Sequence, residues 1–435
     1  MNGHDDGAAS IGQALHELVA DLYPLCRSIT GDGLRQTLRR IARHIPLTIE
    51  EVPTGTPVLD WTVPNEWTIR DAWVADASGG RVIDFQRSNL HVMSYSAPVR
   101  ATMTLAELRP HLFTLPEQPD RIPYRTSYYR EAWGFCLTHR QLQALPEGTY
   151  DVCIDATLAP GTLSYGECYL PGATPAEVLL STHACHPSLG NDNLSGVAVA
   201  TRLAAHLAAL PRRRYSYRVL FVPGTIGAIT WLARNEHRLH HVTHGLVLAC
   251  LGDRGRITYK KSRRGTAEID AVVAHVLAAS GDAHDVVDFR PYGYDERQFC
   301  SPGFDLPVGC LTRTPPGRFP EYHTSADDLD FVRPESLADS FEKLCAVLTT
   351  LERNAVYVNR SPRGEPQLGR RGLYRSIGGD DAAAEELALL WVLNLSDGHH
   401  SLLAIAERAG YPFETIWRAA TRLQEHGLLA PARPS

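Results

Sequence analysis

The chain has 435 residues, of which 44% are hydrophobic and 21% are charged, and its formal net charge at pH 7 is −6. This length and composition are typical of a globular protein with two or three domains, and they exclude a fibrous repeat or a disordered polymer. The negative charge gives no general attraction for nucleic acid or anionic lipid, so neither is an expected partner.

The first residues contain no apolar signal segment, and no run of about 18 apolar residues occurs, so we expect neither export nor membrane insertion. The nine cysteines form no CxxC pair and lie in apolar surroundings. Because this usage is typical of reduced thiols, we expect a cytoplasmic protein.

Residues 11–45 show two helical patterns, separated by a turn at residues 28–33. From residue 50 to residue 129 the pattern changes to short β-prone pieces broken by Pro and Gly, which predicts a small β-rich insert. We interpret its tryptophans, Trp61, Trp67 and Trp73, as core and lid-surface residues in preference to substrate-stacking residues.

Residues 130–358 alternate apolar strand-like runs with helical stretches, as in a sheet covered by helices. The runs at residues 177–182, 217–222 and 245–250 are rich in Val and Leu, which indicates strands buried on both faces. The predicted fold class is therefore α/β, with a mostly parallel central sheet sandwiched by helices. Residues 11–49 and 130–358 form this domain, and the insert spans residues 50–129.

A Gly/Pro/Arg-rich connector at residues 360–379 leads to a separate helical segment at residues 380–435. Its pattern of a helix, a turn at residues 396–398, a short helix, a second turn and an amphipathic helix predicts a winged-helix domain. The recognition helix offers only Arg418 and Arg422 as basic residues, offset by Glu414 and Glu425. A protein-contact or dimerising role is therefore favoured over DNA binding, and a homo-oligomer stays open.

Two segments carry candidate metal ligands. His183 ends a predicted buried strand, where ligand sites of α/β sheets collect, and the following loop carries His186 and Asp192. The next helix begins near Gly196, whose missing side chain lets helix and sheet pack closely. A second Pro/Gly loop precedes His323. Hydrolytic zinc needs about three His, Asp or Glu ligands and an open position for water, so these residues predict a zinc site.

Other interpretations of the same segments remain open. The loop after His183 could be a helix N-cap with two incidental histidines, and a cap at Ser325 is compatible with His323 as a ligand. His186 either replaces a missing carboxylate ligand or packs the loop, and Cys185 is interpreted as a buried thiol in preference to a soft ligand.

At this point the sequence resembles a known family. The stretches THACHPSLGNDNLSGVA and YHTSADDLDF are similar to the metal-binding segments of the di-zinc aminopeptidases with the carboxypeptidase-like phosphorylase/hydrolase fold. Nearly the whole chain resembles bacterial aminopeptidase-like proteins built from that domain, a β-rich insert and a C-terminal winged helix. The stretches that carry this resemblance are CRSITGDGLRQTL, DWTVPNEWTIRDA, IPYRTSYY, GTIGAITWLARNE, YKKSRRG and YDERQFCSPGFDLPVGCLTRTP.

The resemblance implies that His183 and His323 are metal ligands, that Asp192 is shared between two ions, and that Asp253 is a further ligand. The sequence departs from the family in FVPGTIGAI, where the di-zinc enzymes place two adjacent glutamates and this chain has Gly224 and Thr225. Neither residue can accept a proton from water or supply a negative ligand.

Two other carboxylates could replace the missing base. We expect Glu296 first and Glu321 second, although the pair Asp295 and Glu296 could equally be ordinary surface charge. The candidate substrate-binding residues are Arg263, Arg264, Tyr294 and Arg297, with Tyr128 and Tyr129 also plausible by position. Lys260 and Lys261 are interpreted as a solvated turn at the end of a strand.

Three functions follow, in this order of preference. The first is a zinc-dependent hydrolase, with one or two Zn²⁺ ions, that cleaves an amide or peptide bond of a small aminoacyl-type or short peptide substrate. The second is a single-zinc acyl transferase or cyclase on the same fold, as in the glutaminyl cyclases. The third is a non-catalytic, peptidase-like protein that acts through its winged helix.

Overall fold

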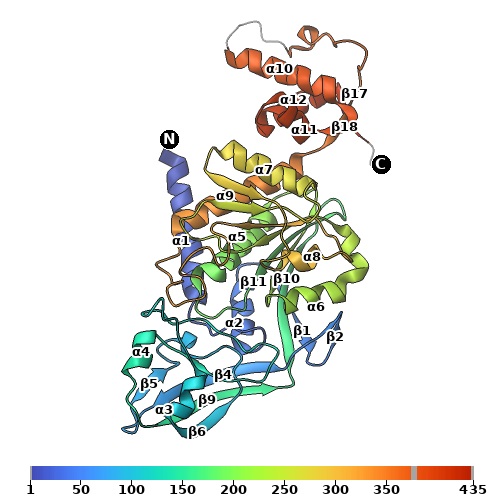
Figure 1. Cartoon of the computed structure of the whole chain (residues 1–435). Helices are drawn as coiled ribbons and strands as arrows, with labels where there is room; N and C mark the ends of the chain where they lie inside the picture. The colour runs from blue at the N-terminus through green and yellow to red at the C-terminus, as the bar shows by residue number, and fades with distance from the viewer. Residues whose placement is uncertain (1, 374–379, 433–435) are drawn as a thin grey trace. The chain divides into compact units, whose positions relative to one another are not determined.

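The computed structural model describes residues 2–373 and 380–432 (Figure 1). The chain divides into two compact units, Met1–Asp270 with Ala283–Leu344, and Ala271–Asp282 with Cys345–Ser435. Among the described residues, every helix is too short or too polar to span a lipid bilayer.

The first unit contains an eight-stranded sheet with the order β1-β10-β12-β11-β13-β16-β14-β15. Its strands are β1 (Thr48–Pro53), β10 (Thr162–Leu170), β11 (Glu177–His183), β12 (Ser216–Val222), β13 (Val242–Leu248), β14 (Ile257–Lys260), β15 (His284–Val287) and β16 (Val308–Thr312). The four central strands β12, β11, β13 and β16 are parallel, while β10 pairs with β12, and β14 with β16, in antiparallel fashion. Every residue of β11 and β12 is buried, which explains why Val and Leu are frequent in both strands.

Several helices of the first unit pack against this sheet, as the predicted α/β architecture requires. The helices outside the winged-helix segment are α1 (Asn2–Leu22), α2 (Asp32–Ile41), α3 (Leu105–Leu108), α4 (His139–Ala144), α5 (Gly196–Ala209), α6 (Ile226–Asn235), α7 (Glu268–Ser280), α8 (Glu296–Phe299) and α9 (Pro334–Arg353). Helix α5 contacts strands β10 to β13, and α1 contacts α5 in turn. The two predicted N-terminal helices are confirmed, although α1 starts at Asn2 and not near residue 11.

The β-rich region is a four-stranded sheet with the order β5-β4-β9-β6. Its strands are β4 (Glu66–Ala75), β5 (Arg81–Asp84), β6 (Val99–Thr104) and β9 (Thr149–Ala159), accompanied by the short strands β2 (Pro57–Val58), β3 (Trp61–Thr62), β7 (Leu112–Phe113) and β8 (Phe135–Cys136). Strand β9 lies beyond the predicted insert of residues 50–129, and β1, which crosses residue 50, belongs to the large sheet. Exposed and buried residues mostly alternate along β9, as expected for a sheet with one solvent-facing side.

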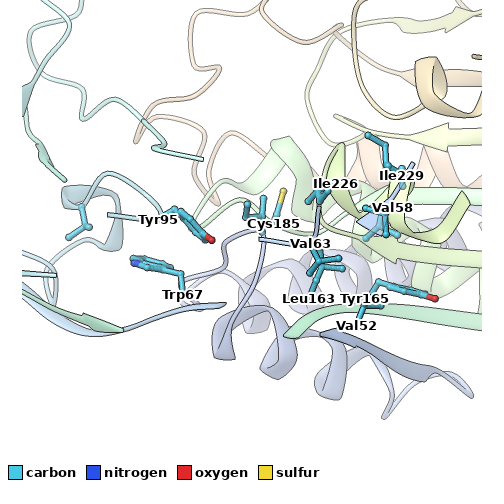
Figure 2. Packing of buried hydrophobic residues seen from close by; sticks show 14 of the residues in the cluster. Val52, Val58, Val63, Trp67, Tyr95, Leu163, Tyr165, Cys185, Ile226 and Ile229 are labelled. Atoms are coloured by element: carbon cyan, nitrogen blue, oxygen red, sulfur yellow. The ribbon is translucent and has the colours of Figure 1, made fainter. Parts of the chain in front are cut away.

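One hydrophobic core connects the small sheet with the large one. Figure 2 shows Trp67 and Tyr95 on one side, Leu163 and Ile226 on the other, and Cys185 between them. Trp67 is a core residue that donates its indole N–H to the Ser96 carbonyl at 2.8 Å. The small sheet is therefore packed onto the sheet that carries His183.

The second unit includes a winged-helix segment, in which helices α10, α11 and α12 accompany a three-stranded sheet with the order β18-β17-β19. Their bounds are α10 (Asp380–Leu395), α11 (Leu402–Ala409), α12 (Phe413–Glu425), β17 (Val356–Asn359), β18 (Asp397–Ser401) and β19 (Leu429–Pro431). The turn predicted at residues 396–398 is mostly the start of strand β18. Residues 374–379 of the predicted connector and residues 433–435 of the predicted domain lie outside the described residues.

Candidate metal centre

His183 is the last residue of β11, at the carboxyl end of the parallel strands. The following loop is held against the sheet by Asn193, whose Nδ2 donates to the Thr182 hydroxyl at 2.8 Å and to the His183 carbonyl at 3.1 Å. Its Oδ1 accepts the Cys250 N–H, just past β13, at 3.0 Å. Asn193 therefore fixes the loop to the ends of two neighbouring strands.

Gly196 makes this close packing sterically feasible, as its sequence position suggested. A Cβ atom at residue 196 would lie 2.5 Å from Asn193 Oδ1 and 2.6 Å from the Leu248 carbonyl oxygen. Both distances are far below van der Waals contact. Helix α5 can begin beside β13 only because residue 196 has no side chain.

Asp192 is the centre of the cluster and is fully buried. Its Oδ1 lies 2.9 Å from His183 Nε2 and also accepts the Tyr294 hydroxyl, while its Oδ2 lies 3.0 Å from His323 Nε2. Burial alone would raise the pKa of Asp192, but His186, His183 and His323 outweigh burial and hold that pKa well below its usual value. The carboxylate therefore stays ionised.

His186 belongs to the same cluster. Its ring centroid lies 4.8 Å from that of His183 and 5.3 Å from that of His323. Ligating atoms of His183, His186 and Asp192 all lie within 4.8 Å of one another. Burial lowers the pKa of His186 well below its usual value, which keeps the imidazole neutral and able to bind a metal.

The donor atoms of this cluster fit a divalent cation such as zinc. Asp192 Oδ2, His186 Nδ1 and His323 Nε2 are buried atoms without a hydrogen-bond partner. Although Asp192 Oδ2 and His323 Nε2 are close, their geometry is not that of a hydrogen bond. Because buried polar atoms without partners are costly, a shared cation would account for all three. Imidazole nitrogen and carboxylate oxygen are the ligands that zinc prefers in hydrolases.

Tyrosine rings hold the histidines in place. Tyr294 stacks on His183 with ring centroids 4.0 Å apart, and Tyr322 stacks on His323 with centroids 3.9 Å apart. Tyr124 contacts His323 edge-on at a centroid distance of 5.0 Å. Of these three tyrosines only Tyr294 was predicted from the sequence, although Tyr322 directly precedes His323 and Tyr124 lies in the stretch IPYRTSYY.

The β-rich insert is attached directly to the loop that carries His323. The Tyr124 N–H donates to the His323 carbonyl at 2.8 Å, and the Ser325 N–H donates to the Ile122 carbonyl at 2.8 Å. Arg121 forms an ion pair with Glu321 at 3.4 Å. The insert therefore helps to set the position of one of the candidate ligands.

Other predicted acidic residues are occupied elsewhere. Asp253 accepts Asn191 Nδ2 at 2.9 Å and the Thr314 hydroxyl at 2.6 Å, so its carboxylate fixes a loop and does not join the histidine cluster. Glu321 is paired with Arg121, and the fully buried Glu296 forms an ion pair with Lys260. Both predicted bases therefore form ion pairs, but Oε2 of Glu296 is buried without a hydrogen-bond partner.

Asp327 and Asp295 are buried carboxylates whose placement the sequence argument missed. Asp327 accepts the backbone N–H of Asn191 at 2.6 Å and that of Asp192 at 2.9 Å, which fixes the Asp192 backbone. Asp295 accepts the Thr225 N–H at 2.7 Å. Local sequence signals did not reveal either partner, because both donors lie far away along the chain.

The basic residues separate into two groups. Arg263 and Arg264 both pair with Asp305, at 2.8 and 3.2 Å. Arg264 also lines a cavity of about 430 Å³ whose other residues include several at the beginnings of β12 and β13. These residues lie at the amino ends of the parallel strands, whereas His183 lies at the carboxyl end. The structure therefore does not bring Arg264 to the cluster.

Arg297 directly follows the ion-paired Glu296, and its buried Nε has no hydrogen-bond partner.

The interpretation of Lys260 as a solvated residue was wrong. Its side chain is only 15% exposed, because it pairs with Glu296 and donates to the Tyr292 carbonyl at 2.7 Å.

Comparisons with known proteins agree with this architecture. A family model described as a domain of unknown function (DUF4910) matches residues 16–354, and a winged helix-turn-helix model matches residues 355–431. A Clostridium acetobutylicum protein, whose name refers to polysaccharide biosynthesis and an aminopeptidase-like domain, is 51% identical over 430 residues, with 99% of each chain covered.

Solved structures show the same fold. A Clostridium acetobutylicum structure described as that of a candidate peptidase has a TM-score of 0.93 and 50% identity, with 99% of each chain covered. BSAP, a zinc aminopeptidase from Bacillus subtilis, has a TM-score of 0.57 and 13% identity, with 78% of this chain and 94% of that chain covered. These similarities confirm the predicted aminopeptidase-like α/β fold and the C-terminal winged helix.

Proposed function

The chain belongs to the DUF4910 family, with the fold of the zinc aminopeptidases, and on that premise we propose that it is a zinc-dependent hydrolase. The proposed reaction is cleavage of an amide or peptide bond in a small aminoacyl-type or short peptide substrate. One observation carries the proposal: a cluster at the end of a strand contains three buried potential ligand atoms without hydrogen-bond partners. The residues of this cluster are His183, His186, Asp192 and His323.

These four residues would hold the zinc. When bound, zinc polarises a carbonyl oxygen and lowers the pKa of bound water. The two carboxylate oxygens of Asp192 face different histidines, Oδ1 toward His183 and Oδ2 toward His323, which favours a shared ligand between two ions. Tyr294 donates to the same carboxylate and so fixes its orientation.

Two exposed aromatic residues, Trp61 and Tyr129, are candidates for substrate contact within the proposal. Trp61 and Tyr129 are 38% and 46% exposed, and their rings meet edge-on at 5.1 Å. Large aromatic side chains in solvent suit contact with an organic substrate. Within the proposal, Tyr294 and Arg297 contact the substrate, because Tyr294 touches the cluster and the Arg297 Nε lacks a partner. Arg263 and Arg264 are left out because they pair with Asp305.

The test combines metal analysis with activity. The purified chain should bind at least one equivalent of zinc and should cleave members of a panel of aminoacyl 4-nitroanilides and dipeptides. Dialysis against a chelator should abolish cleavage, and added zinc should restore it. A zinc content below about a tenth of an equivalent at neutral pH would refute the proposal.

A matched pair of histidine variants locates the site. In H323A, whose native side chain is 34% exposed, zinc affinity should fall by more than the roughly 10- to 100-fold that the loss of a group supporting a ligand costs. The control H237A removes an exposed histidine from the surface and should bind zinc like the wild type. Equal affinities for H323A and H237A would contradict the ligand assignment.

The missing acidic side chains at Gly224 and Thr225 keep the cyclase or transferase alternative relevant. Reaction in ¹⁸O-labelled water separates the two chemistries, because hydrolysis transfers solvent oxygen to the product and cyclisation does not. Mass spectrometry of the products should show one labelled oxygen for each bond cleaved. An unlabelled product that has lost ammonia or water would favour the cyclase.

A further inference from the structure

We propose that Asp295 is the proton acceptor of this site, and that it replaces the acidic side chain missing from residues 224 and 225. The inference rests on the proposed hydrolase function and adds a catalytic residue to it. Asp295 comes from the segment before α8, about 70 residues after the turn that it contacts.

Its position follows from two independent contacts. The Thr225 N–H donates to Asp295 Oδ1 at 2.7 Å, and Thr225 adopts a left-handed φ of 65°, unusual for a β-branched residue. The same turn borders the cluster, because a Cβ atom at Gly224 would lie 3.8 Å from His183 Cβ. The residue before Asp295, Tyr294, stacks on His183 and donates to Asp192. Asp295 is therefore held beside His183 from both directions.

The other acidic side chains around the cluster pair with nearby groups, although Oε2 of Glu296 has no hydrogen-bond partner. These are Asp192 with His183, His323 and Tyr294; Glu296 with Lys260; Glu321 with Arg121; Asp327 with two backbone N–H groups; and Asp253 with Asn191 and Thr314. Among the described residues, Asp295 has no ion pair within 4.0 Å, although it is only 2% exposed. A buried carboxylate without a cation partner is costly and is typical of a functional site.

Several titratable groups surround Asp295. The groups whose charges interact with it are His183 of β11, Cys185 of the following loop, Tyr129 of the insert, Glu296 and Arg297 of α8, and Cys310 of β16. Burial raises the pKa of Asp295 to about 6, against the opposing effects of His183 and the Thr225 N–H.

The proposed step balances without any further reactant. A water oxygen forms a bond to the carbonyl carbon of the substrate while one of its protons passes to Asp295. That proton then passes to the amide nitrogen as the C–N bond breaks, and Asp295 returns to the carboxylate form. The products are an amine and a carboxylic acid, as hydrolysis requires.

The test compares D295N with D288N, which makes the same chemical change at an exposed aspartate nearby. Both variants are prepared as the full zinc-loaded chain and assayed on the best panel substrate. In D295N, kcat should fall on the order of 10²- to 10⁴-fold, while zinc affinity and KM stay close to wild type. D295E should recover part of the lost activity, and D288N should behave as the wild type.

A second readout does not depend on turnover. In the Co²⁺-substituted chain, the visible spectrum should change with pH as the bound water ionises, and D295N should move the midpoint of that change. An unchanged kcat and an unchanged midpoint in D295N would overturn the proposal, as would a large loss of metal affinity, which would make Asp295 a ligand. If the wild type binds no metal, the proposed function itself fails, and the inference fails with it.

Discussion

Replacing Asp295 by asparagine keeps the size of the side chain and the acceptor for the Thr225 N–H, but removes the ionisable group. In the metal-free chain this change should stabilise the fold at neutral pH. The pKa of Asp295 is about 6 in the folded chain and 3.8 for an ordinary aspartate. The folded chain therefore binds this proton more tightly than the unfolded chain does.

The sign of the pH dependence follows from this difference. Between pH 3.8 and about 6, the folded chain holds a proton that the unfolded chain has released, so stability falls as pH rises through this window. Above the window the full penalty is present, about 3 kcal/mol at about 1.4 kcal/mol for each pKa unit. D295N escapes this penalty, so its advantage should be about 3 kcal/mol at pH 8 and roughly half of that at pH 5.

Urea unfolding in the presence of a chelator, followed by near-ultraviolet circular dichroism at pH 5 and pH 8, measures both values. The two units can unfold in separate transitions. The free energies of unfolding are therefore compared for the transition that D295N alters. A D295N chain less stable than the wild type at pH 8, or an advantage independent of pH, would refute the reasoning. D288N provides the baseline, because Asp288 is 92% exposed.

The remaining predictions concern groups that hold the metal loop. N193A leaves the buried Cys250 N–H without its acceptor and removes the donor to the His183 carbonyl, so the free energy of unfolding should fall by roughly 2–4 kcal/mol in urea titrations; a loss within error would show that the loop is fixed by other contacts. In R27M the His186 carbonyl loses the Arg27 Nε donor at 2.8 Å, and zinc affinity measured by chelator competition should weaken roughly tenfold. Unchanged affinity would show that the His186 loop holds its position without Arg27.

Periodic sequence patterns were enough to place the elements that carry His183 and Asp192. The Val- and Leu-rich runs of β11 and β12 indicate buried parallel strands, and a ligand at the end of such a strand follows from general rules. The small sheet was harder to delimit, because β9 joins it from beyond residue 129 through pairing with β4 and β6.

The choice of base could not be predicted from the sequence. Asp295 and Glu296 are neighbours, and their different roles depend on partners distant in the chain. Lys260, 36 residues before Glu296, neutralises that carboxylate, while the Thr225 N–H binds the carboxylate of Asp295. Such pairings come from tertiary packing, which leaves no periodic signal in the sequence. Asp253 was assigned by its place after a strand, but Asn191 and Thr314 already occupy its oxygens.

The backbone bonds between residues 122–124 and 323–325 have a practical consequence for protein engineering. A trimmed catalytic core without the β-rich segment would lose the backbone bonds that support His323, together with the Tyr124 ring that contacts it, so it would be a poor starting point for a minimal enzyme. The same backbone bonds connect the β-rich segment to the loop of His323. An antibody fragment or small binder raised against the four-stranded sheet could therefore change metal affinity from a distance, through the Tyr124 backbone.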